Sequence, residues 1–352
     1  MWYNICMYAD DLIKIFSLST IAFLFAIAIT PLLTDLLYHF KFGKNIRSDG
    51  TTPLYSELHA KKQGTPTMGG ILIWGTALVL AGGFWFLDRL LNLKDFHIFN
   101  FLTRKETLLP LGAMAGAAVV GFIDDFLDIR GRGHKGRGLR FRFKFLLYAL
   151  VASIGAWWFY FKIGFDSVHI PFYGDIFLGW VFIPFFVLVV VGTSFAVNQT
   201  DGLDGLAGGT LATSFFGFAI IAYTQGRPNL AALLGIVIGA LLAFLWFNVH
   251  PARFFMGDTG SMALGVLLAI VAFLTNSVFL LPVIGIIFVV QAATLLMQYF
   301  WRHVFKKKLF LSAPIHHHLE ALGWPESKVT MRFWILSAVS GIIGVIIYFL
   351  DR

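Results

Sequence analysis

Charged residues are scarce in this sequence of 352 residues: Asp, Glu, Lys and Arg make up only 13% of it. A soluble domain usually carries about 25% charged residues. Hydrophobic residues make up 58%, a share that argues against a soluble globular protein. The composition instead predicts one polytopic membrane body.

Cysteine is almost absent as well. The single residue, Cys6, excludes a disulfide framework within the chain and a zinc site built from cysteines. No Walker A sequence occurs. A cleavable signal peptide is not expected, because the first apolar stretch, 15–38, exceeds the roughly 7–15 residues of a signal's apolar region.

Long apolar stretches dominate what is present. A helix needs about 20 mostly apolar residues to cross a bilayer. Ten stretches qualify, at about 15–38, 68–91, 107–123, 145–162, 177–197, 205–224, 229–247, 259–275, 278–301 and 331–350. The sequence therefore predicts an all-α polytopic integral membrane protein with ten transmembrane helices, forming a single transmembrane domain over residues 1–352.

Positive charge is distributed unevenly between the loops. The loops 39–67, 124–144, 198–204, 248–258 and 302–330 hold 18 Lys and Arg, whereas the other loops and the termini together hold eight. The positive-inside rule therefore predicts that these five loops are cytoplasmic and that both termini are periplasmic. The net charge of +8 is then explained by basic residues that collect in cytoplasmic loops. No nucleic-acid partner is expected.

The unusual polar motifs all fall in the five loops predicted to be cytoplasmic or at their edges. These motifs are 64–70, 124–125, 198–205, 248–261 and 313–320. Such a one-sided distribution favours an active site that faces the cytoplasm. A transporter or lipid flippase is the alternative from another class, but it should carry polar groups within its spans and inverted repeats, which are not evident.

Two adjacent carboxylates, Asp124 and Asp125, end the third predicted span. Paired negative charges at a membrane boundary are costly without a cation. The pair is consistent with a Mg²⁺ or general-base site, and equally with a solvated helix end that has basic neighbours such as Arg130.

Asp201 and Asp204 are three residues apart, so they share one helical face if the sixth span begins near them. At a helix N-terminus they would also complement the helix dipole, which is a purely structural explanation. Asn198 adds an amide just before them. Structural and functional interpretations both remain open for this segment.

Asp258 stands at the start of the eighth predicted span. It is either a helix N-cap or a metal ligand, since hard oxygen donors suit Mg²⁺. The nearby Phe255 could stack on a nucleobase or anchor the chain at the membrane interface.

Three consecutive histidines, His316, His317 and His318, cannot all chelate one ion from a single helix, because their side chains point in different directions. Without cysteine ligands, zinc is not favoured. Imidazoles beside a phosphate-handling site are the preferred interpretation. The basic run 130–144 fits either anchoring to anionic lipid or a trap for a diphosphate.

These segments together resemble the phospho-N-acetylmuramoyl-pentapeptide transferase family, within the polyprenyl-phosphate N-acetylhexosamine-1-phosphate transferase superfamily. The matching stretches are Gly64–Gly70, Gly121–Asp125, Asn198–Gly205, Phe247–Ser261 and Pro314–His318, followed by Gly323-Trp-Pro325. They extend from the second span to the tenth, and the triple histidine favours this branch over relatives that use UDP-N-acetylglucosamine.

The resemblance implies a ten-span fold, usually a homodimer, in the bacterial cytoplasmic (inner) membrane. It implies transfer of phospho-N-acetylmuramoyl-pentapeptide from its UDP carrier to undecaprenyl phosphate, giving lipid I and UMP in the first membrane step of peptidoglycan synthesis. A transferase for UDP-N-acetylglucosamine or a related sugar is the alternative within the enzyme class.

Site residues also follow from the resemblance. It implies Mg²⁺ bound by Asp258, with Asp124 and Asp125 as the essential catalytic pair beside it. The substrate-binding residues that it implies are Lys62, Asn198, Asp201, Asp204, Asn248, Phe255, His316, His317 and His318. One departure is that family members often have several lysines just after the aspartate pair, where this chain has Asp128 and arginines.

Overall fold

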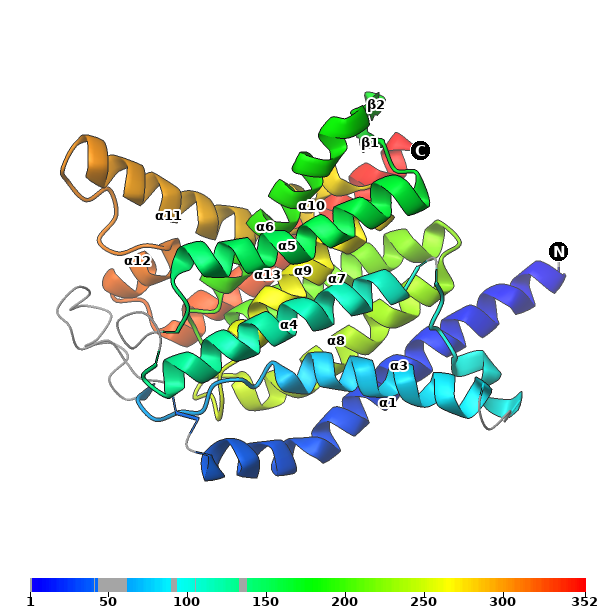
Figure 1. Cartoon of the computed structure of the whole chain (residues 1–352), viewed down its shortest axis with the longest axis horizontal. Coiled ribbons are helices and arrows are strands. Elements are labelled where there is room, and N and C mark those ends of the chain that lie inside the picture. Colours follow the sequence, from blue (N-terminus) through cyan, green and yellow to red (C-terminus); the bar gives the residue numbers. More distant parts are fainter. Residues whose placement is uncertain (1, 41, 44–61, 90–93, 105, 133–137) are drawn as a thin grey trace.

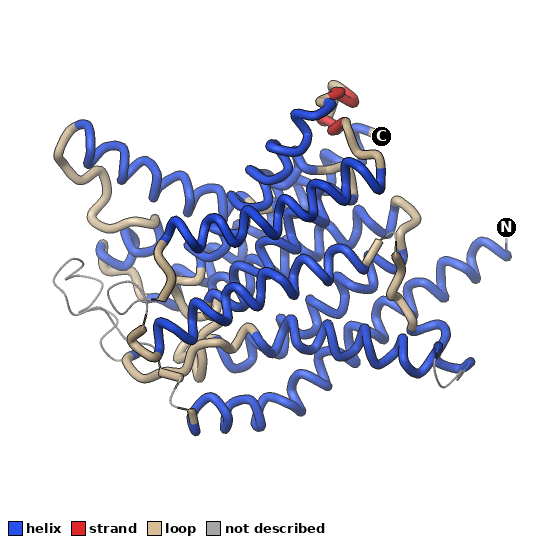
Figure 2. Tube along the Cα trace, in the orientation of Figure 1, coloured by secondary structure: helices blue, strands red, loops and turns tan. Residues whose placement is uncertain are grey.

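Helices make up most of the computed structural model, which describes residues 2–40, 42–43, 62–89, 94–104, 106–132 and 138–352 (Figure 2). The long helices are α1 (Trp2–His39), α3 (Ile71–Arg89), α4 (Leu108–Ile129), α5 (Phe141–Trp158), α6 (Phe182–Thr200), α7 (Leu206–Thr224), α8 (Pro228–Asn248), α9 (Asp258–Leu274), α11 (Ile286–Val304) and α13 (Glu326–Asp351). The short elements are η2 (Lys94–Phe99), η4 (Phe159–Ile163), β1 (Ser167–Ile170), β2 (Gly174–Phe177), η5 (Gly179–Val181), η6 (Val278–Leu280), α10 (Leu281–Ile284) and α12 (Ile315–Ala321).

Each predicted span has a helical counterpart, but not every one is a straight crossing. Within the described ranges, eight helices are long and apolar enough to cross a membrane, and a ninth span is possible if one bent pair of helices is counted as one. The helix over the remaining stretch, α9, has only 17 residues. The prediction of a polytopic helical membrane protein is confirmed, and the number ten stays a prediction.

The ninth predicted span, 278–301, is broken rather than straight. The segments Val278–Ile284 and Ile286–Val304 meet at an angle of 82°. Gly285 lies at the break, and Pro282 is the second residue of the short helix α10 before it. The first part of α11 packs against α6, whereas its far end projects from the bundle (Figure 1), where Leu296, Tyr299 and Phe300 are exposed.

The prediction of an all-α protein is wrong in one detail, because β1 and β2 form an antiparallel hairpin in which Ser167 pairs with Phe177 and Ile170 with Gly174. Figure 1 shows this hairpin at the end of the bundle where both termini lie, opposite the end that holds α12. The two termini therefore lie at the same end of the bundle, which is where the predicted ten crossings would place them.

The short helix α9 lies at the centre of the bundle, with every residue from Thr259 to Leu274 buried. It packs against α4 and α6. A glycine makes the approach of α4 possible, because a Cβ on Gly121 would lie 2.5 Å from the backbone carbonyl carbon of Asp258. Asp124 and Asp125 follow Gly121 by three and four residues, so the same helical face carries both carboxylates to the start of α9.

Candidate active site

Asp124 and Asp258 come from helices far apart in sequence but share one cation, the ammonium group of Lys144 on α5. Lys144 Nζ lies 3.0 Å from Asp124 Oδ2 and also forms an ion pair with Asp258 Oδ2. The other oxygen of Asp124 accepts a hydrogen bond of 2.7 Å from the backbone N–H of Leu139. This arrangement joins the C-terminal end of α4, the start of α5 and the start of α9.

Asp258 is also held from α6. The side-chain amide of Asn198 donates to Asp258 Oδ1 at 2.7 Å and to Ser261 Oγ at 3.0 Å. Both oxygens of the Asp258 carboxylate therefore have partners on other helices, which fixes its orientation. The predicted residues Asn198 and Asp258 are thus brought together.

Asp125 has a different position from its neighbour. Its two carboxylate oxygens accept hydrogen bonds from the backbone N–H groups of Asp258, at 3.1 Å, and Thr259, at 3.0 Å. The first N–H groups of a helix have no partner within the helix, and the helix dipole favours negative charge there. Asp125 therefore caps α9 from another helix, while Asp124 faces the shared cation.

The chemistry of this centre fits Mg²⁺. Carboxylate oxygens of Asp124 and Asp258 approach the same ammonium group, so they create a position that stabilises positive charge. Magnesium prefers hard oxygen ligands and is commonly held by one or two carboxylates together with substrate phosphates. Asp124 and Asp258 are the residues of this chain that would hold it, in place of the Lys144 ammonium group that they bind here.

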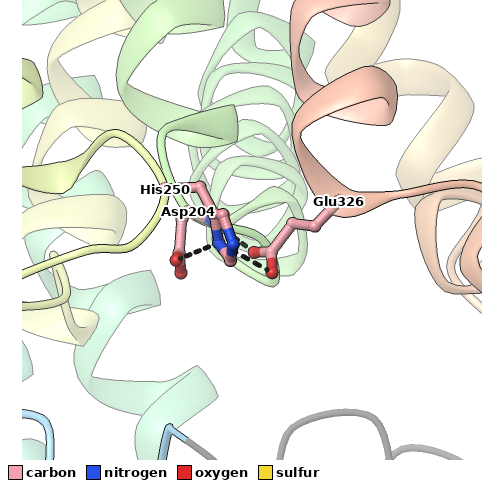
Figure 3. Close-up of side chains that lie close together, drawn as sticks. All are labelled: Asp204, His250 and Glu326. Carbon is pink, nitrogen blue, oxygen red and sulfur yellow. Dashed lines mark hydrogen bonds and ion pairs between the residues drawn. The ribbon is translucent and has the colours of Figure 1, made fainter.

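A second acidic cluster consists of Asp204, His250 and Glu326, whose possible ligand atoms lie within 4.8 Å of one another. His250 Nδ1 is 3.0 Å from Asp204 Oδ2 and 3.4 Å from Glu326 Oε2 (Figure 3). Lys62 already supplies a cation here, with Nζ 2.7 Å from Asp204 Oδ1 and 2.5 Å from Glu326 Oε1. The cluster is therefore an ion-pair network.

Asp204 is the buried member of this network, and its charge is stabilised there. Burial alone would raise the pKa of Asp204. The ammonium group of Lys62 opposes that effect, together with hydrogen bonds from the Ala252 N–H and from His250, and the pKa is lowered on balance. The carboxylate is consequently ionised at neutral pH.

Phe255 lies next to the same network, with its ring centroid 5.8 Å from Lys62 Nζ. Its backbone holds two motifs together, because Phe255 N–H donates to the carbonyl of Pro66 at 2.8 Å and its carbonyl accepts from Gly69 N–H at 2.7 Å. The buried amide of Asn248 is used in a similar way. It accepts from Gly205 N–H at 3.0 Å and donates to the Phe254 carbonyl at 2.8 Å.

Asp201 and Asp204 do not share a helical face, because the helix does not begin at them as that expectation required. Asp201 follows the end of α6, and α7 begins only at Leu206. Both aspartates lie in the turn between the two helices. The turn directs Asp204 toward Lys62.

His316 is the buried member of the histidine triplet. Its Nδ1 is 2.8 Å from Gln291 Oε1 on α11. Its Nε2 packs against the turn after α6, since a Cβ on Gly202 would lie 2.2 Å from that atom. Only a glycine leaves room for the imidazole at this position.

The other two histidines have separate partners. His317 Nδ1 lies 2.7 Å from Glu320 Oε2, and His318 Nδ1 accepts a hydrogen bond of 3.2 Å from the Leu311 N–H. The three rings thus contact three different groups.

Three residues in these clusters were not singled out from the sequence: Lys144, His250 and Glu326. Lys144 belongs to the basic run 130–144, of which residues 133–137 lie outside the described part of the chain, as do residues 44–61 of the loop 39–67. His250 and Glu326 lie in or beside recognised motifs. A contiguous motif does not indicate which of its residues meets a distant partner.

Comparison with known proteins identifies the family of this chain. The model of the family described as glycosyl transferase family 4 matches residues 107–276, and a phospho-N-acetylmuramoyl-pentapeptide-transferase signature matches residues 62–73. A phospho-N-acetylmuramoyl-pentapeptide-transferase from Chloroflexus aurantiacus is 39% identical, covering 96% of this chain and 90% of the relative.

Relatives in other bacteria carry the same name. The protein from Bartonella quintana is 40% identical over 86% of this chain and 83% of its own length. The protein from Geobacillus kaustophilus is 37% identical over 93% of this chain and 95% of its own length. Similarity at this level over nearly the full length of each chain confirms the family indicated by the sequence motifs. The chain belongs to the phospho-N-acetylmuramoyl-pentapeptide-transferase family.

Proposed function

We propose that this chain transfers phospho-N-acetylmuramoyl-pentapeptide from UDP-N-acetylmuramoyl-pentapeptide to undecaprenyl phosphate, giving lipid I and UMP. The observation that carries the proposal is the meeting of Asp124 and Asp258 at one cation, Lys144. That geometry suits a reaction between two phosphate-bearing substrates, and the relatives' names supply the identity of the transferred group.

Phosphoryl transfer depends mainly on positioning and charge stabilisation. Mg²⁺ held by Asp124 and Asp258 would neutralise the diphosphate as UMP leaves. Asn198 keeps the Asp258 carboxylate oriented. Asp125 holds the start of α9 in place.

The acceptor phosphate needs little activation. The second pKa of a phosphomonoester is about 6, so a lipid phosphate is largely ionised near neutrality. Direct attack in one step is therefore preferred, because an acceptor that is already ionised needs no general base. The alternative is a two-step route through an aspartyl–phospho-sugar adduct, which labelled donor would trap in the absence of lipid.

The second cluster is suited to the nucleotide end of the donor. Phe255 offers an aromatic face and Lys62 an ammonium group 5.8 Å from its centre, a pair that can stack on a base and donate hydrogen bonds to it. The histidine triplet lies beside the turn 201–205 through the contact of His316 with Gly202. We assign it to substrate binding with Asn198, Asp201, Asp204 and Asn248.

The membrane arrangement is proposed on the same basis. The chain forms a single domain in the bacterial inner membrane, with α9 and the bent α10–α11 pair completing ten spans. The active-site loops face the cytoplasm and both termini face the periplasm; the distribution of Lys and Arg supports this orientation. A homodimer is proposed from the family resemblance alone.

A donor assay tests this proposal. Purified protein is incubated with undecaprenyl phosphate, Mg²⁺ and either UDP-N-acetylmuramoyl-pentapeptide or UDP-N-acetylglucosamine, and UMP release is measured. We expect release from the first donor only, and its loss on chelation of Mg²⁺. Release from UDP-N-acetylglucosamine alone would support the related sugar transferase, whereas lipid flux without UMP release would support a flippase.

A further inference from the structure

The first residue of α13, Glu326, contacts three other groups around the turn between α6 and α7. Its Oε1 accepts a hydrogen bond of 2.5 Å from Lys62 Nζ and one of 2.7 Å from the backbone N–H of Asp204. Its Oε2 lies 3.4 Å from His250 Nδ1 (Figure 3). Glu326 therefore connects α13 to the nucleotide end of the proposed site.

Little water reaches these charges. The exposed fractions of the side chains are 2% for Asp204, 10% for Glu326 and 17% for Lys62. Two carboxylates in such surroundings repel each other unless a cation lies between them. Lys62 supplies that cation, so the position of its ammonium group is set jointly by Asp204 and Glu326.

A lysine requires such a constraint more than an arginine does. Its ammonium group is a point charge on a flexible stem of four carbons, with no planar geometry of its own. Asp204 alone would fix one contact and leave the stem free to pivot. Glu326 supplies the second contact, which keeps Lys62 Nζ at 5.8 Å from the centre of the Phe255 ring.

We propose that Glu326 is a positioning residue for donor recognition: it holds Lys62 in place beside Phe255 so that the ammonium group meets the nucleotide. This inference rests on the proposed function, because it takes the Lys62–Phe255 pair as the nucleotide subsite. Glu326 acts through Lys62 and does not touch the reacting phosphate.

The variant Glu326→Gln tests the proposal. Loss of one charge-assisted hydrogen bond to Lys62 should weaken UMP binding, measured by titration calorimetry, by about tenfold. In turnover, KM for the UDP-linked donor should rise by about the same factor, with kcat changed by less than about twofold and KM for the lipid phosphate unchanged.

Thr330→Val is the matched control. Thr330 lies one turn further along α13, and its hydroxyl donates to the Asp204 carbonyl at 3.2 Å. This variant removes an anchor between the same helix and the same turn while leaving Glu326 and Lys62 in place. We expect UMP affinity in Thr330→Val to stay within about twofold of wild type. An equal loss of UMP affinity in both variants would mean that Glu326 only anchors the turn, and would overturn the proposal.

A double-mutant cycle with Lys62→Met separates direct from indirect action. If Glu326 acts through Lys62, adding Glu326→Gln to Lys62→Met should change UMP affinity by less than about twofold. A further tenfold loss in that background would overturn the proposal, as would wild-type affinity in the single variant or no UMP binding by the wild type. If Glu326→Gln does not fold, Glu326→Asp replaces it, because its shortened side chain keeps the charge and should give an intermediate loss.

The two proposals fail separately. UMP binding reports on the subsite without any turnover, whereas UMP release from the sugar-linked donor reports on the reaction. Wild-type protein that binds UMP through Lys62 and Glu326 but transfers no sugar phosphate would remove the proposed function alone. Normal transfer with unaltered UMP affinity in Glu326→Gln would remove this inference alone.

Discussion

The adjacent carboxylates Asp124 and Asp125 should differ in what they contribute, and replacing each by asparagine should separate them. Both are 8% exposed, so burial alone predicts that the two substitutions lower stability by similar amounts. Asp125 accepts two backbone hydrogen bonds at the start of α9. An asparagine side chain in its place would keep one acceptor oxygen, lose the charge and leave the other N–H group poorly satisfied.

The expected cost of Asp125→Asn follows from these contacts. Replacing a charge-assisted hydrogen bond and leaving a buried donor unsatisfied costs about 1–3 kcal/mol. Loss of negative charge at a helix N-terminus adds about 0.3–1 kcal/mol. We therefore expect a loss of roughly 2 kcal/mol in the free energy of unfolding, and reduced turnover because Asp258 begins the helix that is no longer capped.

Asp124→Asn should behave differently. Its amide oxygen can still accept from the Leu139 N–H, and Lys144 retains Asp258 as a partner. Breaking one contact of a buried ion pair is costly, but no backbone N–H group loses its acceptor and Lys144 keeps Asp258 as its counter-ion. UMP release should fall sharply because a carboxylate of the reaction centre is gone. The stability loss of Asp125→Asn should therefore be the larger of the two.

Thermal unfolding of both variants in the same detergent, followed by tryptophan fluorescence, gives the order of stability, and UMP release gives the order of activity. The capping role of Asp125 would be refuted by an unfolding midpoint equal to wild type in Asp125→Asn. It would also be refuted if Asp124→Asn lowered the midpoint more than Asp125→Asn did.

Three further predictions follow from single contacts. Asp258→Asn should abolish transfer while the protein remains folded, and turnover at the wild-type rate would remove Asp258 from the centre. Gly202→Ala should displace the His316 ring, because the new Cβ would lie 2.2 Å from Nε2; donor KM should rise at least several-fold, and unchanged kinetics would mean that the ring position does not matter. Burial alone lowers the pKa of His169, but hydrogen bonds to Asp351 and Asp175 outweigh it and the pKa is raised. A raised folded-state pKa stabilises the protein fully below the unfolded value of about 6.5 and no longer once the pH exceeds the folded value. The unfolding midpoint of wild type should therefore exceed that of His169→Gln most at pH 6 and least at alkaline pH, and a pH-independent difference would contradict this.

Most helices could be predicted from the sequence because a bilayer requires long apolar stretches whose backbone is internally hydrogen-bonded. The length and hydropathy of a stretch do not predict its local backbone geometry. These criteria gave no sign of the hairpin Ser167–Phe177, which has only four residues in each strand. They also predicted a single span over 278–301, because hydropathy does not distinguish a straight helix from one bent by 82°. Pro282 and Gly285 in that stretch were the available sequence signal for the bend.

Only the site residues that lie in recognisable sequence motifs could be predicted. Asp124, Asn198 and Asp258 stood out because polar residues at span ends are unusual, and they are brought together by Lys144 and by direct hydrogen bonds. The sequence did not separate Lys144 from the other basic residues of 130–144. Its role depends on a contact with Asp258, 114 residues away, and such pairings arise from tertiary packing.

The length of α9 explains why the charged centre is built in this way. Its 17 residues, at about 1.5 Å each, span about 25 Å, less than the roughly 30 Å of a bilayer's hydrocarbon core. A helix this short, buried along its whole length, can begin below the membrane surface only if other helices cover its polar end. Asp125 accepts hydrogen bonds from the first N–H groups of α9, and Lys144 and Asn198 bind the carboxylate of Asp258. In the proposed reaction, a helix start covered in this way would hold the carboxylates where a lipid phosphate from the bilayer and a soluble nucleotide from the aqueous side could both reach them.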